Sequence, residues 1–193
     1  MAIRKIAQMG HPILRQRAKP VADPTALAVK YLVRDMVDTM IEAAGAGLAA
    51  PQIHESLRVV IFHAPEDRAE GESAENPASA EDSQDRTAPL TVLINPEIDH
   101  LSPHQVDGWE GCLSVEGLRG LVPRSDHIRY RGYDLEGRLI EREARGFHAR
   151  VVQHECDHLD GILYPERMRD LSMLVFTSEL RHGLPQPRER SES

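Results

Sequence analysis

Residues 151–161 contain the pattern that most constrains this chain, a His-Glu-x-x-His motif formed by His154, Glu155 and His158. The apolar spacing around the motif predicts a helix, and two histidines four residues apart lie on one helical face. Two imidazoles one turn apart can bind one divalent metal, and the carboxylate beside them reaches water at the metal. The alternative is a core helix whose histidines only form hydrogen bonds. A third ligand is needed to decide.

The composition is that of an ordinary globular domain. At 193 residues, with 40% hydrophobic and 28% charged residues, the chain is expected to form one domain over residues 1–193. No apolar run approaches bilayer length and the first residues do not resemble a secretory signal, so we expect a cytoplasmic protein with no membrane partner. Two cysteines, Cys112 and Cys156, argue against a disulfide framework and leave each thiol available as a ligand.

Acidic charge is concentrated in residues 64–89. This segment has eight acidic residues and two arginines, a balance of -6 out of a net charge of -8, which leaves -2 for the rest. It contains no Val, Ile, Leu, Met or aromatic residue, so we interpret it as a mobile acidic loop inserted between two strands. A docking segment for a basic partner is the alternative. Specific nucleic-acid binding is not indicated, and a polar tail is predicted from about residue 185.

Periodicity predicts several further elements. Asp23 and Pro24 suggest the N-cap and first position of a helix whose apolar residues recur over residues 29–44, with Gly45 as its stop. Strands are predicted over residues 57–62 and over residues 91–95, the latter ending at Pro96, and a hairpin is predicted from 128–133 and 139–145. A last amphipathic helix is predicted over residues 166–180.

Two polar residues outside the helix are candidates for a reaction centre. Cys112 lies between glycine and leucine in a turn-rich segment, where its thiolate could face the imidazoles, although a lone cysteine is more often structural. Gln52 follows a rigid Ala-Pro pair at the end of the small-residue stretch 45–52, and its amide could donate to an oxyanion.

Three stretches together resemble the signature motifs of the peptide deformylases: Gly45-Ala46-Gly47-Leu48-Ala49-Ala50-Pro51-Gln52, Glu110-Gly111-Cys112-Leu113-Ser114 and Gln153-His154-Glu155-Cys156-Asp157-His158. The resemblance extends from residues 10–15 to about Tyr164, interrupted by the acidic loop. It implies an α+β fold in which antiparallel β-sheets pack around a central metal-binding helix, with an N-terminal helix and a C-terminal helix. It also implies removal of the N-formyl group from the initiator methionine.

The resemblance assigns a role to each motif residue. It implies that Cys112, His154 and His158 bind one divalent metal, with Fe(II) expected and Zn(II), Ni(II) or Co(II) able to replace it. Glu155 is then the general base and acid as metal-bound water attacks the formyl carbonyl and formate leaves. Gln52 and the backbone N–H of Leu113 are then the oxyanion hole.

The expected substrates are N-formylmethionyl nascent peptides, with the ribosome near by. Small residues let main-chain groups pair with an extended peptide, and apolar residues wall the methionine slot unless they are ordinary core. The candidates are Ala46, Gly47, Gly111, Trp109, Phe147 and Val151. Glu116 departs from the family pattern, in which proline is frequent at that place, so the groove rim is expected to differ.

Two other functions are alternatives to deformylation. A zinc metallopeptidase with the same helix motif would need a downstream third ligand, for which His182, Glu166 and Glu179 are the candidates. A structural zinc module usually closes its site with four protein ligands, whereas this chain offers three together with a base and an oxyanion donor.

Overall fold

The computed structural model describes residues 2–66 and 85–185. Most of the predicted acidic loop, residues 67–84, and the tail, residues 186–193, lie outside the described residues. Among the residues that are described, no helix has the length and apolar character needed to cross a membrane.

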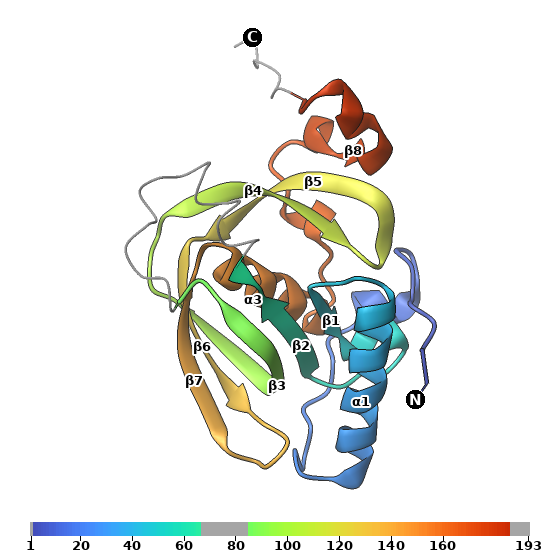
Figure 1. Ribbon diagram of the computed structural model, residues 1–193, viewed down its shortest axis with the longest axis vertical. Coiled ribbons are helices and arrows are strands. Elements are labelled where there is room, and N and C mark those ends of the chain that lie inside the picture. Colours follow the sequence, from blue (N-terminus) through green and yellow to red (C-terminus); the bar gives the residue numbers. More distant parts are fainter. Residues whose placement is uncertain (1, 67–84, 186–193) are drawn as a thin grey trace.

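Two antiparallel sheets surround one central helix (Figure 1). The five-stranded sheet has the order β1-β2-β3-β6-β7, with strands β1 (Gly47–Ala49), β2 (Val59–Ala64), β3 (Ala88–His100), β6 (His127–Tyr133) and β7 (Leu139–Arg145). The three-stranded sheet has the order β4-β5-β8, with strands β4 (Gln105–Cys112), β5 (Val115–Ser125) and β8 (Val175–Phe176). The predicted α+β fold around a central helix is confirmed.

The central helix α3 (Gly146–Leu159) carries the His-Glu-x-x-His motif, and twelve of its fourteen residues are buried. Its apolar side, which includes Val152 and Cys156, packs on Phe62 and Leu93 of the five-stranded sheet. Its polar side faces β4 and β5 and is also buried, so its polar groups need partners inside the protein. Gly161, with φ of 75°, follows the C-cap residue Asp160 at the end of the helix.

The N-terminal helix α1 (Leu27–Glu42) covers the other face of β1 and β2, where it packs on Leu48 and Ile61. It begins at Leu27 with Ala26 as N-cap, so the prediction of an Asp23 cap was wrong. The Asp23 carboxylate instead accepts a hydrogen bond from the backbone N–H of Thr25 in the turn before the helix, at 2.9 Å. The Asp23 side chain is therefore used in a local turn and does not cap α1.

Residues 43–47 also correct the predicted end of α1. The helix stops at Glu42, and Ala44 rather than Gly45 adopts the left-handed conformation, with φ of 51°. Glycine at position 45 allows close packing, because a Cβ there would lie 3.0 Å from Cδ1 of Leu113 and would require that side chain to shift. The small residue serves close packing and not the helix stop itself.

The predicted end of a strand at Pro96 was also wrong, because β3 continues to His100. Its pairing with β6 shifts register between Ile94 and Glu97, and Asn95 has φ of 52°. A bulge therefore accommodates the proline, which has no N–H to donate. The predicted hairpin is confirmed: β6 and β7 pair from His127↔Arg145 to Tyr133↔Leu139.

The predicted C-terminal helix is present only as a short 3-10 helix, η6 (Thr177–His182). One continuous helix over residues 166–180 is not formed, so that span was wrong. The chain instead forms η4 (Tyr164–Arg167), η5 (Leu171–Met173) and β8 before η6. β8 pairs with Leu118 and Arg119 of β5, and this pairing interrupts the helical pattern. The free edge of β5 offers backbone hydrogen-bond partners to an extended segment but not to a helix.

Candidate metal centre and groove

Three side chains from two elements meet at the polar face of α3. The ligand atoms of Cys112, at the end of β4, and of His154 and His158, on α3, all lie within 4.8 Å of one another. Sγ of Cys112 is 3.3 Å from Nε2 of His158. Among the described residues, this is the only group of three or more His, Cys, Asp or Glu that could hold a metal ion.

The charges at this centre suit a divalent cation. Burial lowers the pKa of His154, but hydrogen bonds to Cys112 and Glu110 outweigh it and raise that pKa well above its usual value. Burial and the neighbouring His154 hold the pKa of His158 well below its usual value. One thiol and two imidazoles form a donor set that soft and borderline metals prefer. The residues present therefore fit a bound metal.

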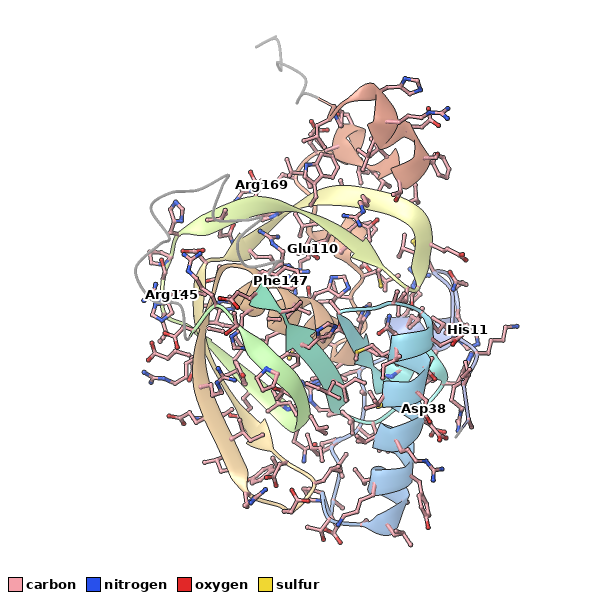
Figure 2. The ribbon with its side chains drawn as sticks, in the orientation of Figure 1. His11, Asp38, Glu110, Arg145, Phe147 and Arg169 are labelled. Atoms are coloured by element: carbon pink, nitrogen blue, oxygen red, sulfur yellow. The ribbon has the colours of Figure 1, made fainter. Side chains whose placement is uncertain are left out.

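Glu110 of β4 orients one of these imidazoles. Its Oε2 accepts a hydrogen bond from Nδ1 of His154 at 2.7 Å, which leaves Nε2 of His154 as the nitrogen available for a metal. Arg124 donates to both Glu110 oxygens, at 2.8 and 3.0 Å, and Arg150 donates to Oε1 at 3.1 Å. Burial alone would raise the pKa of Glu110, but Arg124 and His154 hold it well below its usual value. Figure 2 shows Glu110 on β4, beside α3.

The buried ion network extends beyond Glu110. Arg124 also donates to Asp157, which in turn accepts from Arg167 of η4, while Arg150 donates to the carbonyls of Val106 and Val122. The network ties α3 to β4, β5 and η4. None of Glu110, Arg124, Arg150, Asp157 and Arg167 is predicted as a site residue from the sequence. Arg150 carried a signal, because it precedes His154 by four residues and shares its helical face.

Glu155 lies beside the candidate metal ligands and is 4% exposed. Burial raises its pKa to about 7. Among the described residues, its buried Oε2 has no hydrogen-bond partner, and a buried carboxylate oxygen without a donor calls for a water or ligand there. Gly47 of β1 passes directly over it, since a Cβ at that position would lie 2.3 Å from Oε1 of Glu155.

Gln52, in the 3-10 helix η2 (Ala50–Ile53), is fixed at both ends of its amide. Its Oε1 accepts from the N–H of Ala49 at 2.8 Å, and its Nε2 is 3.2 Å from Oγ of Ser114 and 3.5 Å from Sγ of Cys112. The donor therefore points at the metal centre. Leu113 directly follows Cys112, in the turn between β4 and β5.

A cavity of about 1100 Å³ opens onto this centre. Glu155, Gln52, Cys112 and His154 line it together with all six predicted substrate residues, Ala46, Gly47, Trp109, Gly111, Phe147 and Val151. Phe147, labelled in Figure 2, lies in the first turn of α3. Glu116 lines the cavity as well, so the departure from the family pattern reaches its rim.

Two sheet edges flank the cavity, because β1 ends the five-stranded sheet and β4 ends the three-stranded sheet. The N–H of His63 donates to the carbonyl of Ala46 at 2.9 Å, and Gly47 lies opposite Phe62. In an antiparallel ladder the pair next to a hydrogen-bonded pair points its N–H and C=O outward. The peptide groups of Gly47 are thus directed away from β2, and an extended peptide can pair with them.

The candidate third ligands of the metallopeptidase alternative lie elsewhere. Oε1 of Glu166 accepts from the N–H of Leu163 at 3.0 Å, and Glu179 lies in η6 beside His182. Neither glutamate belongs to the described metal-ligating group, and His182 does not belong to it either.

Comparison with known proteins decides the family. A model of the family described as polypeptide deformylase matches residues 3–173. The chain belongs to the polypeptide deformylase family. It is 52% identical to Peptide deformylase 2 of Ralstonia nicotianae over 188 residues, which cover 95% of this chain and 97% of that relative. It is also 52% identical to Peptide deformylase 1 of Bordetella pertussis, over 92% of this chain and 94% of the relative.

Solved deformylase structures share the fold. The Met-Ala-Ser-bound class I type b peptide deformylase of Acinetobacter baumannii has a TM-score of 0.73 at 36% identity, covering 86% of this chain and 100% of that one. The Thermotoga maritima peptide deformylase has a TM-score of 0.74 at 31% identity, covering 88% of this chain and 100% of that one. The predicted family is thereby confirmed.

Proposed function

We propose that this chain removes the N-terminal formyl group from formyl-methionine at the start of newly made polypeptides, releasing formate. The observation that carries the proposal is the meeting of Cys112, His154 and His158 within 4.8 Å at a cavity that Glu155 and Gln52 also line. A metal site, a proton acceptor and a fixed amide donor are the parts that hydrolysis of an amide requires.

The peptide is proposed to lie extended between β1 and β4. The outward peptide groups of Gly47 bind its main chain on one side, and the edge of β4 at Gly111 binds it on the other. Phe147, Val151 and Trp109 form the walls of the methionine slot, since all three line the cavity beside the centre. The solved neighbour that holds Met-Ala-Ser supports a tripeptide ligand in this fold.

Cys112, His154 and His158 are proposed to hold one divalent metal, with Fe(II) native and Zn(II), Ni(II) or Co(II) as replacements. When bound, such a metal supplies a Lewis acid that polarises the formyl oxygen and acidifies water. The thiol favours a soft or borderline ion, which supports this set over Mg²⁺ or Ca²⁺. Glu110 holds His154 in the tautomer that presents Nε2.

Glu155 is proposed to move the proton. Its carboxylate accepts a proton from the attacking water and then delivers it to the nitrogen of the leaving amine, so the peptide departs with a free N-terminus. Its position beneath Gly47 supports this role, because a peptide paired with β1 would lie over it. A pKa of about 7 suits both halves of the transfer.

Gln52 and Leu113 are proposed to stabilise the negative oxygen of the tetrahedral intermediate. Nε2 of Gln52 and the N–H of Leu113 would donate to it from fixed positions. One such donor is typically worth about 2.7–4 kcal/mol of barrier. The hydrogen bond that the N–H of Ala49 donates to Oε1 of Gln52 supports the assignment, because it fixes which end of the amide faces the centre.

The proposed setting is the cytoplasm, close to the ribosome from which formylated chains emerge. Residues 1–193 are proposed to form one deformylase domain that binds no nucleic acid specifically. The net charge of -8 supports the last point, because phosphate backbones attract basic surfaces.

The test is an anaerobic assay of protein loaded with Fe(II) or Ni(II), measuring formate release from formyl-Met-Ala-Ser. Wild type is expected to release formate, the Glu155→Gln variant to lose nearly all activity while keeping its metal, and unformylated peptide to yield none. Cleavage of internal peptide bonds without formate would favour the metallopeptidase instead. If the metal-loaded, folded protein shows no activity in either assay, a binding role would be favoured.

A further inference from the structure

Residues 6–9, here called the N-terminal strap, cross the two segments that carry the proposed oxyanion donors. The N–H of Ala7 donates to the carbonyl of Gln52 at 2.8 Å, and Nε2 of Gln8 donates to the carbonyl of Leu113 at 3.1 Å. The N–H of Met9 donates to the carbonyl of Ser114 at 2.7 Å. We propose that the strap sets the distance between the two oxyanion donors and that Gln8 is a positioning residue for the reaction.

The two donors need such a link because they belong to different sheets. Gln52 follows β1 of the five-stranded sheet, whereas Leu113 lies in the turn between β4 and β5 of the three-stranded sheet. Within residues 2–66 and 85–185, no backbone ladder joins these two sheets. The side chain of Gln52 reaches Ser114 directly, at 3.2 Å, but that contact uses the donor nitrogen itself. The strap bonds only the carbonyls, so it holds both segments and leaves the donors available.

The strap is held in place by hydrogen bonds and burial on both sides. Before it, the N–H of Arg4 donates to Oγ1 of Thr39 on α1 at 2.9 Å, and the Arg4 guanidinium pairs with Glu55, just after η2, at 2.8 Å. Ala7 is 2% exposed. A segment bonded to α1, to η2 and to the β4–β5 turn transmits its position to all three.

The role of the strap can be tested at Gln8 without unfolding the protein. Gln8 is exposed and lines the cavity, so truncation of its side chain removes little buried apolar surface. Its hydrogen bond ends on the carbonyl of Leu113, which only the φ and ψ rotations of Leu113 separate from the Leu113 N–H. Loss of the bond frees the turn that aims this N–H, while the fold keeps its core.

The experiment measures formate release by the metal-loaded full chain and compares Gln8→Ala and Gln8→Glu with wild type. Neither alanine nor a carboxylate can donate to the Leu113 carbonyl, so both variants should behave alike. Because complete loss of one oxyanion donor costs about 10²–10³-fold in kcat, misplacement of one should lower kcat by about 3–10-fold. KM should stay within about twofold, because the donor acts on the transition state.

Gln16→Ala is the matched control. Gln16 is an exposed glutamine of the same N-terminal region that lies outside the cavity lining. Its variant should keep the wild-type kcat, and thermal midpoints of all variants should agree closely with wild type. A fall in kcat that only tracks a fall in thermal midpoint would overturn the inference, because it would make Gln8 merely structural.

The inference rests on the proposed function, and a parallel Gln52→Ala variant separates the two. If Gln52→Ala loses kcat while the Gln8 variants retain it, the strap is not a positioning device and the proposed function stands. If KM rises and kcat is retained, Gln8 contacts the substrate instead, which also overturns the inference. If wild type releases no formate, both fail together.

Discussion

Nδ1 of His154 donates to Oε2 of Glu110 at 2.7 Å, inside a network in which Arg124 and Arg150 saturate the same carboxylate. The carboxylate can only accept, so a proton must reside on Nδ1, and Nε2 is the ring nitrogen left to bind a metal. Glu110, which is assigned no role in the three motifs, thus decides which nitrogen of His154, a proposed metal ligand, faces the centre.

Replacing Glu110 by glutamine should therefore weaken metal binding. We expect about a 10–100-fold loss of affinity, because partners that orient ligand imidazoles typically contribute that much. A chelator-competition titration with Zn(II) or Co(II) measures the change. Stability should fall as well, by at most about 3–5 kcal/mol, since the buried guanidinium of Arg124 loses one of its two carboxylate partners and keeps Asp157. Unaltered metal affinity in the folded variant would contradict the orienting role.

Gly47→Ala should damage catalysis without displacing the metal. The added methyl would lie 2.3 Å from Oε1 of Glu155, so the carboxylate must move. A displacement of this size at a reacting group can cost about 10²-fold in rate. Steady-state formate release gives kcat, and elemental analysis gives metal content, which should match wild type. Near-normal kcat would show that Glu155 has more freedom than its packing indicates.

His63→Ala should weaken substrate binding more than turnover. Nε2 of His63 lies 3.2 Å from the carbonyl of Gly45, and the backbone N–H of His63 donates to the carbonyl of Ala46. This residue therefore holds the β1 side of the groove, and alanine would remove only the side-chain contact. Loss of one hydrogen bond of about 0.5–1.5 kcal/mol should raise KM by about 2–10-fold, with kcat little changed. His100→Ala is the control, because His100 is exposed and lies outside the cavity lining. Equal KM values for the two variants would refute the prediction.

His148 should make stability depend on pH. It is fully buried between the hydroxyl of Tyr130 and the carbonyl of Asp85, and burial lowers its pKa to about 4. The unfolded chain binds its proton near pH 6.5, so stability is present above 6.5 and is lost as pH falls toward 4.

The measurement for His148 is urea unfolding of wild type and His148→Gln at pH 7 and pH 5. The free energy of unfolding of wild type should fall by about 2 kcal/mol more than that of the variant over this interval. Glutamine keeps a donor and an acceptor but does not titrate. An equal fall in both proteins would assign the acid sensitivity to other groups.

Local patterns predicted much of the fold. The hairpin of β6 and β7 alternates apolar and polar residues around an Asp-Leu-Glu-Gly turn, and each strand formed as expected. Predictions failed where a partner far along the chain competed with a local preference. The helical pattern near the C-terminus yielded to pairing of β8 with β5, and the strand continued through Pro96 because a bulge absorbed the missing donor.

Sequence alone was sufficient to place His154 and His158 on one helical face and to recognise the family, because both depend on short covalent spacings. It could not reveal that Glu110 orients His154, that His63 supports the groove edge, or that residues 6–9 join Gln52 to Leu113. Those relationships connect segments up to about a hundred residues apart, and their distances depend on how two sheets pack around α3. Burial likewise raises the pKa of Glu155 only once the folded chain has removed water from it.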